Sequence, residues 1–203
     1  MQKIARAAAA AWGVAVGLLI IAPTAARATT YDAVNGFSKK SNPNGPWSDF
    51  AAGQMLTQKE TEPGDKKIHF WWNGKKLPNA AIIGRNYGKA AYQGPTVFIF
   101  PGRLDMDPEQ ISDVTVRFTV PNNGYYTFNG SFEGADTQEA PHGVAIAKNG
   151  TIVFTRTISA FKQLVTFNGQ GNLKKGDTLD FINQTDGTGS NLSVGLKLML
   201  QNN

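Results

Sequence analysis

The segment Val114-Thr-Val-Arg-Phe-Thr-Val120, followed by Pro121-Asn-Asn-Gly124 and Tyr125-Tyr-Thr-Phe-Asn-Gly-Ser-Phe132, decides the fold class. Apolar side chains occupy alternate positions on both sides of the turn-forming residues: Val114, Val116, Phe118, Val120, Tyr126, Phe128 and Phe132. Alternation with a period of two is typical of β-strands that bury one face. We therefore predict an antiparallel hairpin here, in an all-β protein.

Further short alternating segments extend this prediction along the chain. Asn149-Gly150 joins two such segments and is a strong hairpin signal, because both residues tolerate positive φ. The last segment places Leu192, Val194, Leu196, Leu198 and Leu200 on one face. Other strand candidates cover residues 68–72, 80–83, 96–100, 161–167 and 178–182. About nine or ten strands without a helix of ordinary length predict a two-sheet antiparallel β-sandwich of jelly-roll type.

The first 28 residues have the features of a signal peptide. Lys3 and Arg6 precede an apolar run over residues 7–21, and Ala26-Arg27-Ala28 supplies the small residues that precede a cleavage site. We expect cleavage before Thr29, then one β-sandwich domain over residues 29–203 with a loop-rich N-terminal part. An uncleaved anchor or an amphipathic helix is the alternative. The prediction implies a secreted or periplasmic protein without a membrane span in the mature chain.

Charge and cysteine content restrict the function. The formal net charge is +5, but Lys3, Arg6 and Arg27 lie in the leader, which contains no acidic residue. Residues 29–203 therefore carry 17 basic and 15 acidic residues, and we expect no nucleic-acid partner. The chain has no cysteine, which excludes thiol nucleophiles and thiolate metal sites.

Catalytic motifs are scarce. The two histidines, His69 and His142, do not have the spacing of a metal-ligand pair, and no Gly-x-Ser-x-Gly elbow is present. A glycosidase requires two facing carboxylates, for which Glu133 and Asp136 directly after a strand are the candidates. Acidic residues at strand ends also serve turns and solubility, so we expect no catalytic residue.

Asp105 and Asp107 are the candidate metal ligands. Alternate carboxylates can contribute to a calcium site in a loop. Two acids fill only part of the six to eight oxygen positions that calcium takes, and solvated aspartates are the alternative. We expect no obligatory cofactor.

Aromatic side chains indicate a binding site. Trp71, Trp72, Tyr92 and Tyr125 offer apolar ring faces to the C–H groups of a sugar, and Arg103 offers hydrogen bonds to its hydroxyls. Neighbouring strand residues face opposite sides, so Trp71 and Trp72 cannot both lie in one core. We expect one of them to be exposed or covered by a loop. The alternative is that these rings are core or loop anchors, which is the role we assign to Trp47.

Several motifs resemble a family of exported bacterial jelly-roll β-sandwich proteins, of the kind found in exosortase-sorted (PEP-CTERM-like) surface proteins. They are Asn42-Pro-Asn-Gly-Pro-Trp47, Gly102-Arg-Leu104, Val116-Arg-Phe-Thr-Val-Pro121 with Gly124-Tyr125, Phe128-x-Gly-x-Phe132-x-Gly134-x-Asp136, Lys148-Asn-Gly150 and Lys175-Gly-Asp-Thr-Leu-Asp-Phe181. The resemblance covers Phe37 to Leu200. It implies export, a surface or matrix role and carbohydrate association, and it transfers no catalytic residue. The sequence ends in Met199-Leu-Gln-Asn-Asn203 without a sorting tail, so we expect a freely secreted or periplasmic protein.

We therefore expect a secreted, non-catalytic binding or matrix-associated domain whose partner is an extracellular glycan or matrix component. One alternative is a structural protein that self-associates through a sheet face or edge. Another is a carboxylate-dependent glycan-active enzyme using Glu133 and Asp136. The sequence leaves the ligand and the oligomeric state open.

Overall fold

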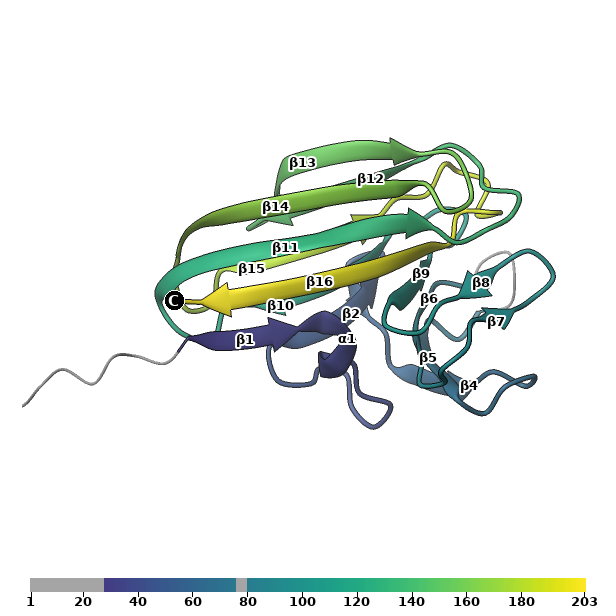
Figure 1. Cartoon of the computed structure of the whole chain (residues 1–203), viewed down its shortest axis with the longest axis horizontal. Helices are drawn as coiled ribbons and strands as arrows, with labels where there is room; N and C mark the ends of the chain where they lie inside the picture. Colours follow the sequence, from purple (N-terminus) through teal and green to yellow (C-terminus); the bar gives the residue numbers. More distant parts are fainter. Residues whose placement is uncertain (1–27, 76–79) are drawn as a thin grey trace, which may run out of the picture.

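The computed structural model describes residues 28–75 and 80–203. The predicted leader, residues 1–28, lies outside this part of the chain except for Ala28. The described residues form an all-β jelly roll in which two antiparallel sheets stack as a sandwich (Figure 1). No helix in these residues is long and apolar enough to cross a membrane.

Sheet A has eight strands, in the order β14-β11-β16-β9-β6-β5-β4, with β1 paired to β16. Their bounds are β1 (Thr29–Asp32), β4 (Gln58–Thr61), β5 (Ile68–Trp72), β6 (Ile82–Asn86), β9 (Leu104–Asp107), β11 (Gly124–Gly134), β14 (Leu164–Leu173) and β16 (Val194–Asn202). The short strands β4, β5, β6 and β9 gather at one end, while β11, β14 and β16 run along the length of the sandwich (Figure 1).

Sheet B has six strands in the order β13-β12-β15-β10-β2-β3. They are β2 (Trp47–Ala51), β3 (Gln54–Met55), β10 (Val114–Thr119), β12 (His142–Lys148), β13 (Thr151–Ile158) and β15 (Thr178–Asn183). Two very short strands, β7 (Tyr92–Gln93) and β8 (Phe98–Ile99), form a separate pair. The four-residue helix α1 (Ala33–Gly36) follows β1 and is capped by Asp32, which accepts a hydrogen bond from the Asn35 amide.

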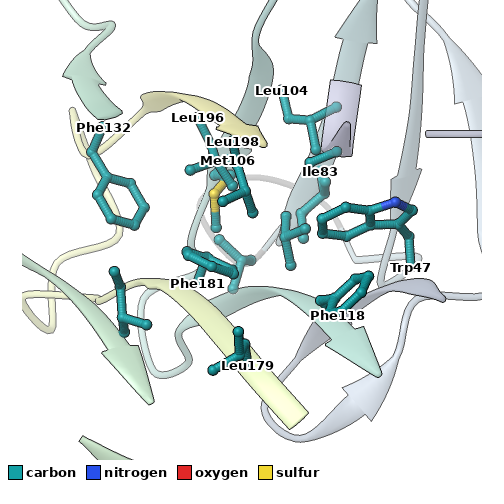
Figure 2. Close-up of a cluster of buried hydrophobic side chains, with 14 of the residues drawn as sticks. Trp47, Ile83, Leu104, Met106, Phe118, Phe132, Leu179, Phe181, Leu196 and Leu198 are labelled. Carbon is teal, nitrogen blue, oxygen red and sulfur yellow. The ribbon is translucent and has the colours of Figure 1, made fainter. Parts of the chain in front are cut away.

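The core lies between the two sheets (Figure 2). Sheet B contributes Phe118 and Phe181, and sheet A contributes Phe132 and Leu198, each at most 1% exposed. Trp47 packs on Phe118 with ring centroids 5.0 Å apart, so it anchors the N-terminal part to the core as expected. The alternation read from the sequence therefore identifies the buried faces correctly.

The predicted hairpin at 114–132 is wrong. The first strand, β10, pairs with β2 and β15 in sheet B, whereas β11 pairs with β14 and β16 in sheet A. The Pro121–Gly124 segment therefore crosses between the layers. Both strands still turn their apolar sides to the same core, where Phe118 and Tyr126 meet edge to face at 6.1 Å. Alternation reports which side of a strand is buried, and a crossing strand satisfies it as well as a paired one.

The prediction at Asn149-Gly150 is confirmed. β12 and β13 pair directly, and both turn residues have positive φ, 49° and 80°. The last strand also has the predicted faces, with Leu196, Leu198 and Leu200 buried.

The predicted count of nine or ten strands is too low, since the described residues contain sixteen. The additional strands are short, and four of them lie in the part predicted to be loop-rich: β1, β2, β3 and β4.

Candidate functional site

The outer face of sheet A, which points away from the core, carries mostly uncharged polar side chains. Cross-strand neighbours on β14, β11 and β16 form two adjacent rows. Thr166, Ser131 and Lys197 make the first row. Asn168, Asn129 and Met199 make the second row. Because neighbouring strands lie about 4.8 Å apart, the three side chains of each row span a distance that one or two sugar rings can cover.

A break in the edge of β16 opens a hollow beside these rows. β9 pairs with β16 only as far as Leu196, and β1 pairs with it only from Met199 onward. Between them, Lys197 and Leu198 have no strand neighbour on that edge in the described chain. A pocket of about 550 Å³ lies at this break, which we name the outer-face pocket. Its lining residues are Asp32, Val34, Asn35, Arg85, Gly102, Asn129, Gly130, Ser131, Thr166, Lys197, Leu198 and Met199.

The wall of the pocket nearest α1 is held by Arg85. Its guanidinium donates to the Val34 carbonyl at 2.6 Å and to Asn35 Oδ1 at 3.1 Å. Its Nε is buried and has no hydrogen-bond partner in residues 28–75 and 80–203. Arg85 is therefore fixed by helix α1 rather than by a carboxylate, and its positive charge is retained at the pocket.

Arg103 orders Ser131, which lines the pocket. Its Nη1 donates to Ser131 Oγ at 3.0 Å, and its Nη2 forms an ion pair with Glu133. Gly195 permits this position, because a Cβ there would lie 2.8 Å from Arg103 Cδ. Arg103, predicted as a ligand-binding residue, borders the outer-face pocket and positions Ser131.

Other lining groups are free to bind. Within the described residues, the side chains of Asn129, Thr166 and Lys197 make no hydrogen bond or ion pair with the protein, and all three are exposed. Met199 adds an apolar side chain that is 42% exposed. Amide and hydroxyl groups next to an apolar contact fit the alternating hydroxyls and C–H groups of a sugar.

The predicted aromatic residues are not brought together. Trp71, one of the two tryptophans predicted to bind a ligand, is buried at 6% exposure and donates from Nε1 to the Ser38 carbonyl at 2.8 Å, so it is a core residue. Trp72 points to the other side of β5, as expected, but it is half-buried. Tyr92 lies on β7, and its hydroxyl donates to Glu62 at 2.9 Å, a bond that raises the pKa of Tyr92.

Tyr125 is 40% exposed on the outer face of β11. It lies six residues from Ser131, about 20 Å along the strand. A short ligand in the outer-face pocket therefore does not reach it, whereas an extended one does.

The candidate metal ligands lie in a strand, not in the predicted loop. Asp105 and Asp107 both belong to β9 and share its face opposite Met106. Burial raises the pKa of Asp105 well above its usual range and that of Asp107 to about 7. Among the described residues, no three His, Cys, Asp or Glu side chains are placed to hold a metal ion.

These aspartates belong to a buried carboxylate cluster, which we define as Asp105, Asp107, Asp136 and Glu139. Asp136 accepts hydrogen bonds from Thr96 Oγ1 at 2.9 Å and from the Gln138 amide at 2.8 Å. Burial and the charge of Asp136 raise the pKa of Glu139 to about 8, although backbone amides partly offset them. Glu139, whose pKa is raised to about 8, therefore holds its proton at neutral pH instead of presenting a charge to solvent.

Sequence reasoning missed Arg85, Asn129, Thr166 and Met199. The outward positions of β11, β14 and β16 were readable from alternation. The break in the edge of β16 was not, because it depends on where β1 and β9 stop pairing.

No family model matches the sequence, and no curated protein matches it. Among solved structures, a family 35 carbohydrate-binding module from Clostridium thermocellum is 14% identical, with a TM-score of 0.34 over 86% of this chain and 98% of the module. A family 29 carbohydrate-binding module is 15% identical, with a TM-score of 0.36 over 86% of this chain and 88% of that one. A GH26-CBM35 mannanase from Podospora anserina is 10% identical, with a TM-score of 0.35 over 87% of this chain but only 28% of its own length.

Proposed function

We propose that the protein is a secreted, non-catalytic β-sandwich that binds carbohydrate in the outer-face pocket. The observation that carries this proposal is a set of exposed lining side chains that have no partner among the residues the structure describes, Asn129, Thr166 and Lys197, beside Met199. Polar side chains that are already exposed and unbonded lose little when they bind, because no internal hydrogen bond has to break. The signal-peptide pattern of residues 1–28 supports export.

The positions of Glu133 and Asp136 support a glycan-cleaving role less well than a binding role. Glu133 is ion-paired with Arg103, and Asp136 is buried with two hydrogen-bond donors on its carboxylate. Both acids are thus engaged in holding the fold. A general acid or a nucleophile needs access to the substrate, which the burial of Asp136 denies.

The binding proposal is tested by isothermal titration calorimetry against a panel of soluble polysaccharides. The double variant Asn129→Ala, Thr166→Ala removes an amide and a hydroxyl from adjacent rows of the pocket, and we expect binding to weaken about 10-fold or more. The control is Thr155→Ala, Thr157→Ala, because both threonines are exposed on β13 in the other sheet. Equal affinity of the two double variants, or no binding to any polysaccharide, would contradict the proposal.

A second candidate function, self-association, is favoured by one observation. β13 lies at the edge of sheet B, and its Ile152 and Val153 are 55% and 60% exposed. Exposed apolar side chains on an edge strand are a common route to pairing between copies.

A further inference from the structure

A second pocket, of about 350 Å³, lies between the start of β5 and the segment that follows α1. It is lined by Lys39, Lys40, Lys59, Glu60, Thr61, His69 and Phe70, and we name it the basic pocket. Three lysines face one glutamate here, in a mature chain whose net charge is only +2. The basic pocket therefore has a local excess of positive charge.

The cations of the basic pocket are not neutralised by the protein. Elsewhere in the described chain, Lys75, Arg103 and Arg117 form ion pairs with Glu109, Glu133 and Asp180. Within the same residues, Lys39, Lys40 and Lys59 have no carboxylate within ion-pair distance. An anion that enters the pocket thus meets uncompensated charge.

An aromatic ring holds two of the nearby cations in place. The Lys39 ammonium lies 5.7 Å from the ring centroid of Tyr87, and the Arg85 guanidinium lies 4.5 Å from it. The Tyr87 hydroxyl donates to the Phe37 carbonyl at 3.3 Å. The rings of His69 and Tyr87 lie edge to face, with their centroids 5.6 Å apart. A cation–π contact positions a cation without cancelling its charge, as a carboxylate would.

Arg85 connects the two pockets. It lines the outer-face pocket, and its guanidinium lies over the same tyrosine ring as Lys39. On the other side, Asn35 lines the outer-face pocket, and Lys39 lines the basic pocket four residues later. The two pocket linings are therefore connected through Arg85 and through the segment from Asn35 to Lys39.

We infer that the carbohydrate is an acidic polysaccharide, whose anionic groups bind Lys39, Lys40 and Lys59 in the basic pocket while another part of the polymer occupies the outer-face pocket. This inference rests on the proposed function. The uncharged amides and hydroxyls of the outer-face pocket fit sugar hydroxyls, and the basic pocket supplies the counter-charge for carboxylate or sulfate groups. A nucleic acid fits less well, because both cations crowd the ring of Tyr87 and leave it unavailable for base stacking.

The test measures affinity for four probes: a galacturonate oligosaccharide, a sulfated heparin-derived oligosaccharide, a neutral mannan oligosaccharide and a single-stranded DNA oligonucleotide. We expect an acidic oligosaccharide to bind at least about 10-fold more tightly than the neutral one, with affinity falling as salt is added. The carboxylated and sulfated probes distinguish which anion is preferred. The double variant Lys39→Gln, Lys59→Gln removes this preference. The control, Lys174→Gln, Lys175→Gln, alters exposed lysines in the turn before β15 and retains it.

A spectroscopic readout locates the anion. The chain has two histidines, and desolvation together with the charge of Lys39 lowers the pKa of His69. An anion bound beside Lys39 offsets that charge, so the pKa of His69 measured by NMR rises on binding, whereas that of the buried His142 does not change.

The other outcomes overturn either the acidic-ligand inference alone or the proposed function as well. Equal affinity for neutral and acidic oligosaccharides, or an unaffected lysine variant, overturns the acidic-ligand inference and leaves the proposed function standing. Failure of every oligosaccharide to bind overturns both, and binding of the DNA probe alone overturns both in favour of a nucleic-acid partner.

Discussion

The outer-face pocket and the buried carboxylate cluster are both polar regions built partly on sheet A, but the first exposes its polar groups to solvent and the second buries them. In the outer-face pocket, the side chains of Asn129, Thr166 and Lys197 are exposed and form no hydrogen bond within the described part of the chain. In the cluster, Asp105 and Asp136 are buried, and one oxygen of Asp105 has no hydrogen-bond partner among the same residues. Exposed polar groups cost the fold little and remain available to a ligand, whereas buried acids make the stability depend on pH.

The largest expected effect is this dependence on pH. Unfolded carboxyl groups titrate near pH 4, whereas Asp107 keeps its proton to about pH 7 and Glu139 to about pH 8 in the folded protein. Between these values the folded state binds more protons than the unfolded state, so raising the pH favours unfolding. Each group contributes up to about 1.4 kcal/mol per pH unit, which amounts to a few kcal/mol from pH 5 to pH 8.

The measurement is urea unfolding at pH 5, 6, 7 and 8. We expect Glu139→Gln to flatten the decline in the free energy of unfolding, because the amide keeps an oxygen for the Asp136 amide but cannot ionise. The same change at exposed Glu60 is the control and leaves the slope as it is. A wild-type protein whose stability rises from pH 5 to pH 8 would show that Asp107 and Glu139 do not have raised pKa values.

Two neighbouring lining residues of the outer-face pocket, Gly130 and Asn129, are expected to differ in how much their substitution destabilises the protein. A Cβ on Gly130 would lie 2.2 Å from the Lys197 carbonyl oxygen and 2.6 Å from the ring of Phe167. We expect Gly130→Ala to lower the free energy of unfolding by about 1–3 kcal/mol. The adjacent outward change Asn129→Ala should stay within about 0.5 kcal/mol, and chemical denaturation that shows equal losses would remove the distinction.

The smallest expected effect concerns the exposed edge of sheet B. Val153 is an extra residue in β13, since Ile146 pairs with Phe154 while Ala147 pairs with Ile152. Such a bulge interrupts the row of groups that a second strand would need. We therefore expect a monomer by light scattering, unchanged by Val153→Lys. A dimer that this variant dissociates would favour self-association over glycan binding.

Much of the fold was readable from the sequence, and less of the site. The alternation in Val114–Thr119 and in β16 gave the buried faces, and Asn149-Gly150 gave a true hairpin. The pairing of β10 was missed because apolar alternation is the same whether the next strand lies beside it or across the core.

The site was missed for a related reason. The adjacent tryptophans Trp71 and Trp72 predicted a site on β5, but the Trp71 side chain packs in the core. The outer-face pocket instead arises where β1 and β9 stop along β16, which is a consequence of pairings between distant segments. A sequence pattern reports the sides of each strand but not where its neighbours end.

The most direct test of the central claim is an NMR titration of the protein with the glycan it binds most tightly. We predict that amide chemical-shift changes concentrate at Asn129, Thr166 and Lys197 on the outer face of sheet A. Shifts confined to β13 or to the carboxylate cluster, with these three residues unaffected, would contradict the account.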